Sequence, residues 1–189
     1  MKVVITGHSA GIGKTVYNQL INDRHDVVGF SLENGYDIGL EDIRQQIINA
    51  SINADIFINN AYHLVGQIDL LKKIITAWQG QDKIIINMGS KVTNCQDFND
   101  YNNDYTSIDA PIYVAAKKKL QEIVKDRTEM LPKICNIIPG MVDTELTKDI
   151  SCSKLSTNTI ADIVKYVLDH KDNVWIQEII LENPILELK

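Results

Sequence analysis

The sequence predicts a single α/β domain, a doubly wound parallel sheet of about six to seven strands with helices on both faces. Short runs rich in Ile and Val alternate along the chain with segments whose apolar residues recur at helical spacing. Most of these runs are apolar without alternation, as in strands buried on both faces. Strand and helix repetition with short links favours parallel strands joined by right-handed crossovers.

Six runs are predicted to be strands, at residues 2–6, 26–31, 54–59, 83–88, 134–138 and 174–181. Two of the predicted helices are marked by apolar stripes, Ile12, Val16 and Leu20 in one and Ile43, Ile47 and Ala50 in the other. Three more helices are predicted at residues 64–78, 111–125 and 159–168. The one long irregular stretch, residues 91–110, is rich in Asn and Asp, and such loops are usually functional or mobile.

Composition narrows the class of protein. With 189 residues, 44% hydrophobic and 23% charged, the chain is expected to form one soluble domain over residues 1–189. We expect neither a membrane span nor a signal peptide, because no apolar run is long enough and polar residues interrupt the N-terminal one. The net charge of −6, without a basic tract, argues against nucleic-acid binding.

Cysteine and histidine spacing point to neither disulfides nor metal. Cys95, Cys135 and Cys152 are widely separated, which favours a reducing cytoplasm. The four histidines lack metal-ligand spacing, so no metal site is expected.

The first predicted strand leads through a glycine-rich turn, residues 6–13, directly into a helix. In such a turn Gly7 permits the tight bend, Gly11 lets the backbone approach a pyrophosphate, and Gly13 lets the helix pack close to the sheet. Free N–H groups at the helix start would face the anion. This placement predicts nucleotide binding.

The spacing Gly-x-x-x-Gly-x-Gly after Thr6 resembles that of the short-chain dehydrogenase/reductase family. Further segments resemble family motifs in the same order, and they are Asn59-Asn60-Ala61-Tyr62, Asn87-Met88-Gly89-Ser90, Tyr113-x-x-x-Lys117, residues 139–144 and the last strand, residues 175–181. Each lies at the carboxyl end of a predicted strand, on the next helix, or at the last strand. The resemblance covers essentially the whole chain and implies a Rossmann-type fold.

The resemblance implies a catalytic group of Ser90, Tyr113 and Lys117. Tyr113 and Lys117 are four residues apart, so both lie on one helix face, where the ammonium favours the phenolate. Tyr113 would exchange a proton with the substrate oxygen, Ser90 would hydrogen-bond that oxygen, and Lys117 would also hold the nicotinamide ribose. His63 stands where the family carries the Asn of its catalytic tetrad, and either a relay role or an incidental one is open.

The resemblance also implies a set of cofactor contacts, and these are Gly7, His8, Ser9, Gly11, Ile12, Gly13, Ser31, Leu32, Asp37, Ile38, Asn60, Ala61, Tyr113, Lys117, Pro139, Gly140, Val142 and Thr144. Asp37 would contact the adenine amino group, Asn60 and Ala61 the adenosine side, and Val142 and Thr144 the carboxamide. NAD is favoured over NADP because residues 30–33 contain no cation and Glu33 would repel a phosphate. Hydrogen bonds from Ser31, Asn34 or His8 to a phosphate leave NADP open.

Three departures from the family pattern carry expectations of their own. Residues 31–37 lead almost straight from the second strand into a short third strand at Asp37-Ile38, so the family's second helix is nearly absent. The segment between Asn60 and Ser90 is shorter than in the family. Residues 144–156, where the substrate lid begins, are also short, which predicts a small or polar substrate.

The expected function is therefore an NAD(P)-dependent oxidoreductase that acts on a small carbonyl or secondary alcohol, with Tyr113 as general acid and base. One alternative is an NAD(P)-binding sensor or interaction module with little turnover. Another is a nucleotide-sugar epimerase or dehydratase of the same superfamily, which the 23-residue step from Ser90 to Tyr113 favours and the absence of a sugar-binding domain disfavours. The resemblance implies a homodimer or homotetramer formed through residues 64–78 and 111–125.

Overall fold

The computed structural model describes residues 1–94, 110–126 and 131–183. The strands are β1 (Lys2–Thr6), β2 (Asp26–Phe30), β3 (Ile56–Asn59), β4 (Ile84–Met88), β5 (Lys133–Pro139) and β6 (Glu178–Leu181). The α-helices are α1 (Gly11–Asn22), α2 (Glu41–Ser51), α3 (Gly66–Ala77), α4 (Ala110–Lys125) and α5 (Thr157–Asp169). Short 3₁₀ helices include η1 (Leu32–Asn34), η2 (Lys91–Asn94) and η4 (Glu145–Thr147).

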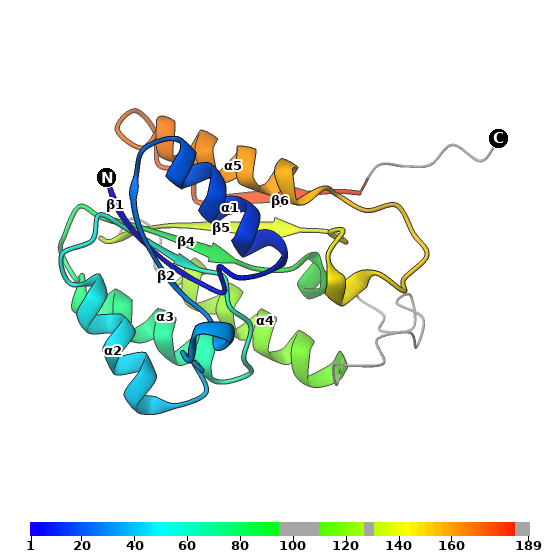
Figure 1. Ribbon diagram of the computed structural model, residues 1–189, viewed down its shortest axis with the longest axis horizontal. Helices are drawn as coiled ribbons and strands as arrows, with labels where there is room; N and C mark the ends of the chain where they lie inside the picture. Colours follow the sequence, from blue (N-terminus) through cyan, green and yellow to red (C-terminus); the bar gives the residue numbers. More distant parts are fainter. Residues whose placement is uncertain (95–109, 127–130, 184–189) are drawn as a thin grey trace.

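All six strands are parallel, in the order β2-β1-β3-β4-β5-β6 (Figure 1). β2 lies on one side of β1. The chain then crosses over β1, and β3 to β6 follow in order on its other side. Strand order therefore reverses between β1 and β3. In open α/β sheets, ligands bind at the carboxyl ends of the strands beside such a reversal.

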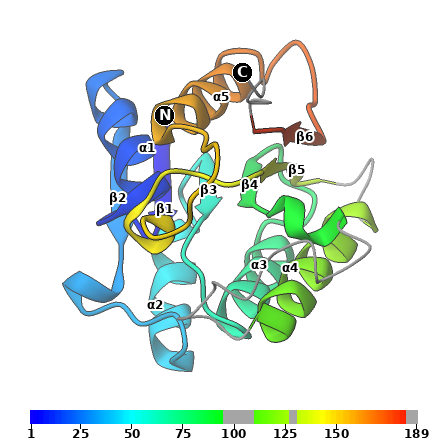
Figure 2. The same ribbon diagram turned by 90° about the vertical axis from the view of Figure 1, so that its right-hand side faces the viewer.

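Helices cover both faces of the sheet. α1 and α5 pack together on one face, and α2, α3 and α4 cover the other (Figures 1 and 2). Alternate residues of each strand point to opposite faces of the sheet. Ile58 and Ile86 pack in the core beneath α1 and α5, while Phe57 and Ile85 pack toward α3 and α4. This two-sided burial explains why the strands read as continuous apolar runs.

The strand register brings the predicted motif residues to one edge of the sheet. Asn59 of β3 pairs with Asn87 of β4, and Asn87 pairs with Asn136 of β5. Because neighbouring strands end at similar heights, the loops that follow β1, β3, β4 and β5 all begin at the same edge.

Most of the predicted elements are confirmed, but one strand is shorter than predicted and another, the short third strand, is not formed. All five predicted helices are present, and the first five strands match to within two residues at either end. The last strand begins at Glu178 rather than at residue 174. Before it, the Trp175 indole donates to the Ile134 carbonyl at 3.1 Å and Asn136 N–H donates to the Gln177 carbonyl at 2.8 Å, so this segment lies beside β5 without forming a ladder.

The predicted short third strand at Asp37-Ile38 is wrong. The Asp37 carboxylate accepts the Gly39 N–H at 2.8 Å, and the Asp37 carbonyl accepts the Leu40 N–H at 3.0 Å, which closes a local turn. The Ile38 carbonyl accepts the Arg44 guanidinium at 2.7 Å instead of a strand neighbour. Between β2 and this turn the chain forms the short 3₁₀ helix η1.

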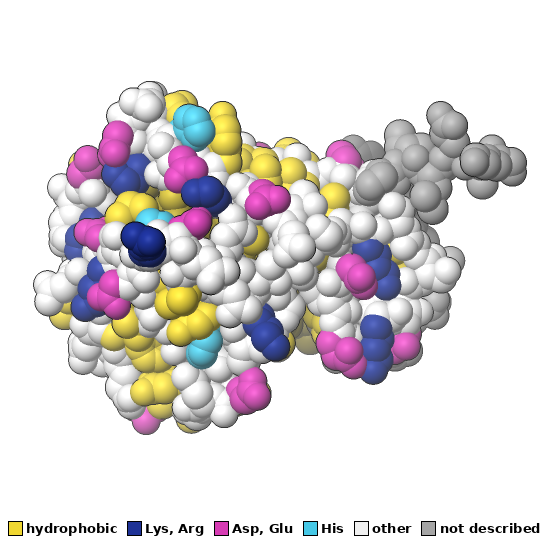
Figure 3. All heavy atoms as spheres, turned by 45° about the horizontal axis from the view of Figure 1, so that its top comes forward, with side chains coloured by type: hydrophobic (Ala, Val, Ile, Leu, Met, Phe, Trp, Pro, Cys, Tyr) yellow, Lys and Arg dark blue, Asp and Glu magenta, His cyan; other side chains and the backbone are white. Residues whose placement is uncertain are grey.

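Charges of both signs are interspersed on the face drawn in Figure 3. On the surface of α5, Lys165 pairs with Asp23 and Asp169, each at 3.2 Å. This face therefore carries no extended patch of one sign.

Cys135 is buried and Cys152 is exposed, and both are free thiols. Burial raises the pKa of the Cys135 thiol to about 12, so it is protonated at neutral pH. Cys95 lies outside the described residues, as do residues 95–109 of the predicted irregular stretch, 91–110. The first four residues of that stretch form η2, and Ala110 begins α4. Among the described helices, none has the length and apolar character needed to cross a membrane.

Arg44 is 8% exposed and should be essential for stability because its guanidinium satisfies the Ile38 carbonyl and the Asp69 carboxylate, the latter at 2.9 Å. We expect Arg44→Met, which keeps the apolar stem, to lower the free energy of unfolding by about 2 to 3 kcal/mol. Urea denaturation measures this loss.

The matched control is Lys73→Met, because Lys73 pairs with the same Asp69 from a more exposed position, at 3.4 Å. Its loss should be clearly smaller. Equal losses in the two variants would contradict the role given to Arg44.

Candidate functional site

The turn between β1 and α1 requires glycine at three positions. Gly7 has a φ of +73°, and its N–H donates to the Phe30 carbonyl at 2.6 Å, which ties the turn to β2. A Cβ on Gly13 would lie 2.0 Å from the Gly7 carbonyl oxygen, so only glycine lets α1 start this close to β1. Gly11 has a φ of +51°, and the place of its missing Cβ is 3.3 Å from the Thr144 methyl group. The turn thus meets the loop that follows β5.

No side chain caps the first N–H groups of α1. The N-cap residue, Ala10, makes no side-chain cap, and no acidic residue lies in the first turn. Ser9 is half-buried in the turn, and Ile12 packs against the core on the α1 and α5 face. A helix start of this kind suits a phosphate group, since its N–H groups carry partial positive charge.

Asn60 joins the glycine turn to the loop after β3. Its side-chain amide donates to the carbonyls of Thr6 at 3.0 Å and Gly7 at 3.2 Å. In return, the buried Thr6 hydroxyl accepts the N–H groups of Asn60 at 3.1 Å and Ala61 at 3.0 Å. The sequence interpretation placed Asn60 beside adenosine; in the structure its amide faces the turn and holds the two sides of the strand-order reversal together.

The His8 ring packs against Gly29, near the carboxyl end of β2. A Cβ on Gly29 would come within 2.4 Å of this ring, whose centroid is 4.9 Å from that of Tyr17. Ser31 is 4% exposed, and its N–H and hydroxyl both donate to Asn34 Oδ1, at 2.8 and 3.1 Å. Ser31 and Asn34 therefore form a closed turn at a place where the sequence predicts a cofactor contact.

The other residues after β2 that the sequence prediction involves in cofactor binding lie in different surroundings. Leu32 is 74% exposed and Glu33 is also exposed. Ile38 is buried in the core on the α3 face, and the Asp37 carboxylate closes its own turn.

Ser90, Tyr113 and Lys117 come together at the carboxyl end of β4. Ser90 follows β4, its hydroxyl shares a hydrogen bond with the Tyr113 phenol, and Tyr113 and Lys117 project from α4. Burial raises the pKa of the Tyr113 phenol, and the hydrogen bond with Ser90 opposes that rise. The Tyr62 ring packs edge-on against Tyr113, with centroids 4.9 Å apart. At neutral pH this cluster presents a protonated phenol beside a hydroxyl.

Lys117 is a buried cation. It is 4% exposed, and its ammonium donates to Gln67 Oε1 at 3.0 Å and to the Met88 carbonyl at 2.9 Å. Burial lowers the pKa of Lys117 to about 7. The ammonium also lies 5.5 and 5.7 Å from the ring centroids of Tyr62 and Tyr113.

The sequence interpretation missed Gln67 and singled out His63 instead. His63 Nδ1 accepts the Gly66 N–H at 3.1 Å, so His63 caps the start of α3. Gln67, one turn further along and 1% exposed, is the residue that reaches Lys117. The signal in the sequence is a polar residue on the apolar stripe that continues through Leu70 and Ile74.

The loop after β5, residues 140–156, is tied to the sheet by hydrogen bonds. Gly140 follows Pro139, and its N–H donates to the Leu181 carbonyl at 2.9 Å. A Cβ on Gly140 would lie 2.1 Å from Asn183 Oδ1. Asn183 bonds both the N–H and the carbonyl of Met141, at 2.8 and 2.6 Å. The returning chain forms a parallel bridge between Val142 and Leu155, so the loop closes on itself beside the glycine turn.

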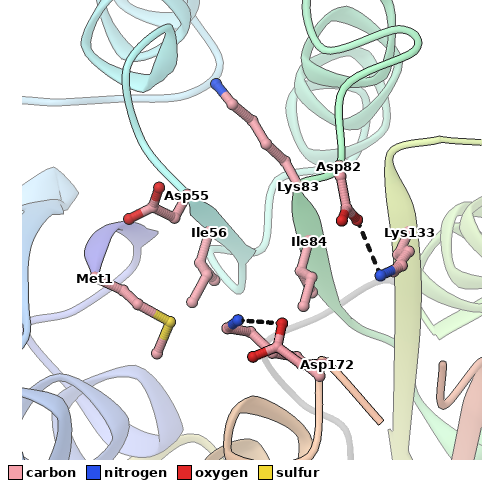
Figure 4. Close-up of a pocket in the computed structure, with 9 residues that line it drawn as sticks. Met1, Asp55, Ile56, Asp82, Lys83, Ile84, Lys133 and Asp172 are labelled. Atoms are coloured by element: carbon pink, nitrogen blue, oxygen red, sulfur yellow. Dashed lines mark hydrogen bonds and ion pairs between the residues drawn. The ribbon is translucent and has the colours of Figure 1, made fainter. Parts of the chain in front are cut away.

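A separate cavity of about 230 Å³ lies at the opposite, amino-terminal edge of the sheet (Figure 4). Its charged side chains largely pair with one another, Lys133 with Asp82 at 2.9 Å and Lys171 with Asp172 at 2.5 Å. Within residues 1–94, 110–126 and 131–183, no group of three or more His, Cys, Asp or Glu side chains could hold a metal ion. The candidate functional site is the carboxyl edge, because Ser90, Tyr113 and Lys117 come together there.

Asn60 offers a test of the tie across the site. We expect Asn60→Ala to lower the free energy of unfolding by about 1 to 3 kcal/mol, because the carbonyls of Thr6 and Gly7 each lose a donor. Asn60→Asp should cost more, since a carboxylate would face the same carbonyls. Urea denaturation checks both, with the exposed Asn49→Ala of α2 as a near-neutral control. An Asn60→Asp variant as stable as the control would show that the tie is unimportant.

Solved structures with the same fold include the 3-alpha-hydroxysteroid dehydrogenase from Pseudomonas sp. B-0831 complexed with NADH, at 12% identity, covering 96% of this chain and 94% of that chain. A serine dehydrogenase complexed with NADP+ matches at 15% identity, covering 97% and 95%. The 3-ketoacyl-(acyl-carrier-protein) reductase from Brucella melitensis complexed with NADH matches at 15%, covering 96% of each chain. The TM-score is 0.74 in all three cases. No protein-family model and no curated protein matches the sequence. The fold of this chain is that of the short-chain dehydrogenases/reductases.

Proposed function

We propose that this protein is an NAD(P)-dependent oxidoreductase that moves a hydride between a nicotinamide cofactor and a small carbonyl or secondary alcohol. One observation carries the proposal: Ser90, Tyr113 and Lys117 gather at the same sheet edge as the glycine turn. The structures with the same fold support it, because they are dehydrogenases and a reductase complexed with NADH or NADP+.

The glycine turn fits a dinucleotide. The first turn of α1 has no side-chain cap and no acidic residue, which leaves its backbone N–H groups open to a pyrophosphate. We assign the pyrophosphate to this turn, the nicotinamide ribose to Lys117, and the carboxamide to the segment from Val142 to Thr144.

We propose NAD as the preferred cofactor. Residues 29–37, which end β2 and form η1, contain no lysine or arginine to pair with a 2′-phosphate. NADP is the alternative, through hydrogen bonds from Ser31, Asn34 and His8. Parallel titrations with the two cofactors separate these assignments.

The proposed chemistry divides between cofactor and protein. When bound, the nicotinamide supplies or accepts the hydride. In the direction of reduction, Ser90 donates a hydrogen bond to the carbonyl oxygen and Tyr113 transfers its phenolic proton to that oxygen, which yields the alcohol. The raised pKa of Tyr113 keeps the phenol protonated but makes it a weak acid. A charged Lys117 offsets this weakness by stabilising the phenolate that remains.

A small or polar substrate is proposed from the tied loop after β5. The contacts of Asn183 and the bridge from Val142 to Leu155 hold the start and the end of that loop close to the sheet, which favours a small substrate. We also propose a homodimer or homotetramer through α3 and α4, to be checked by light scattering.

A second candidate is an NAD(P)-binding protein with little turnover. It is favoured by the fact that two of the three N–H donors of Lys117 already point at Gln67 and Met88. The substitution of Tyr113 distinguishes the two candidates.

Tyr113→Phe should lower kcat by at least about 100-fold, because the variant has no proton to transfer. The dissociation constant for NADH should stay within about threefold, since the ring remains in place. Steady-state kinetics and nicotinamide fluorescence measure the two quantities.

Tyr166→Phe is the matched control, because Tyr166 lies half-exposed on α5 and stacks against His170. It should leave both quantities unchanged. Turnover retained in Tyr113→Phe would refute the general-acid role and favour the second candidate.

A further inference from the structure

Gln67 is held in one orientation by its neighbours. Its Nε2 donates to the Asn59 carbonyl at 3.1 Å and to the Met88 carbonyl at 3.4 Å, while its Oε1 accepts from the Lys117 ammonium at 3.0 Å. A flipped amide would face oxygen against two carbonyls and an NH₂ group against an ammonium. The contacts therefore fix the Gln67 oxygen toward Lys117.

A row of buried asparagines anchors Gln67 to the sheet. Asn59 Nδ2 donates to the Gln67 carbonyl at 3.2 Å and to Asn87 Oδ1 at 2.9 Å, and Asn87 Nδ2 donates to Asn136 Oδ1 at 2.8 Å. These three asparagines, which we call the asparagine row, are 0% exposed and occupy paired positions of β3, β4 and β5. Both the side chain and the main chain of Gln67 are thus tied to the rigid centre of the fold.

The surroundings of Lys117 give this contact its importance. A buried ammonium is stable only when its donors find acceptors, and the acceptors here are Gln67 Oε1 and the Met88 carbonyl. Within the part of the chain that the structure describes, the titratable side chains whose rings face it are Tyr62, from the loop after β3, and Tyr113, from α4. Gln67 is neutral, so it stabilises the cation without cancelling its charge.

We propose that Gln67 is a positioning residue that holds the Lys117 ammonium beside Tyr113 and stabilises its charged form. The inference deepens the proposed function, on which its catalytic meaning rests. It gives Gln67, rather than His63, the place of the polar partner of Lys117 at the start of α3.

The test measures the pKa of Lys117 by NMR of the lysine side-chain ¹³Cε in the cofactor-free protein, with the signal assigned by its loss in Lys117→Met. Gln67→Met keeps the length of the side chain but removes the acceptor, so it should lower the pKa of Lys117 by about one pH unit. Gln67→Glu places a carboxylate there and should raise the pKa by about one pH unit or more. Opposite shifts cannot arise from general loosening of the fold.

Gln45→Met is the matched control, because Gln45 is exposed on α2 and bonds Asn49. It should leave the pKa of Lys117 unchanged. If Gln67→Met does not fold, the rise in Gln67→Glu alone decides. An unchanged pKa of Lys117 in the folded Gln67 variants would overturn the inference.

Kinetics supply the second readout. In the direction of reduction, kcat should fall as pH rises through the pKa of Lys117, because the phenolate then loses its stabilising charge. This fall should move to lower pH in Gln67→Met and to higher pH in Gln67→Glu, with little change in KM. A fall that stays fixed while the NMR titration moves would refute the catalytic meaning of the contact. Failure of the proposed function would show separately, as absence of both NADH and NADPH binding in the unsubstituted protein.

Discussion

The hydrogen bonds of Asn60 across the strand-order reversal are the interaction on which the arrangement of the site depends. On one side lie β1, the glycine turn and β2; on the other lie β3 to β6, which carry Ser90 and, through α4, Tyr113 and Lys117. A parallel sheet sets the height at which these strands end, but it does not fix the loops beyond them. The side chains of Asn60 and Thr6 fix those loops through four hydrogen bonds, each to a backbone group of the opposite segment. The glycine turn and the loop after β3 therefore form one rigid edge.

The second constraint is the burial of Lys117. A lysine in a protein core is costly unless polar groups replace the lost water, and this need accounts for the polar side chains at the centre of the α3 and α4 face. Gln67 and the Met88 carbonyl serve the ammonium directly, and the asparagine row holds Gln67 in place. The resulting cluster combines a lysine of lowered pKa with a phenol of raised pKa, because burial disfavours the charged form of each group. Such a pairing is typical of sites where a proton is moved.

Local pattern was enough to predict most of the fold. Continuous Ile and Val runs predict buried parallel strands, and the glycine spacing predicts a turn in which a Cβ on Gly13 has no room. The sequence did not reveal that the short third strand is missing. The Ile38 carbonyl bonds the Arg44 side chain instead of a neighbouring strand, and such a replacement leaves no local signal in the sequence. Gln67 was missed for a similar reason. Helical spacing places it on the buried face of α3, but only the packing of α4 shows that Lys117 lies opposite.

The most direct test of the central claim is a titration of the purified protein with NADH and NADPH, followed by nicotinamide fluorescence. The proposed function predicts saturable binding of at least one of them at micromolar concentration, and its loss in Gly13→Val, whose side chain cannot fit beside the Gly7 carbonyl. Circular dichroism of that variant shows whether the loss is local to the turn. Binding of neither cofactor up to millimolar concentration would contradict the claim that this sheet edge is a dinucleotide site.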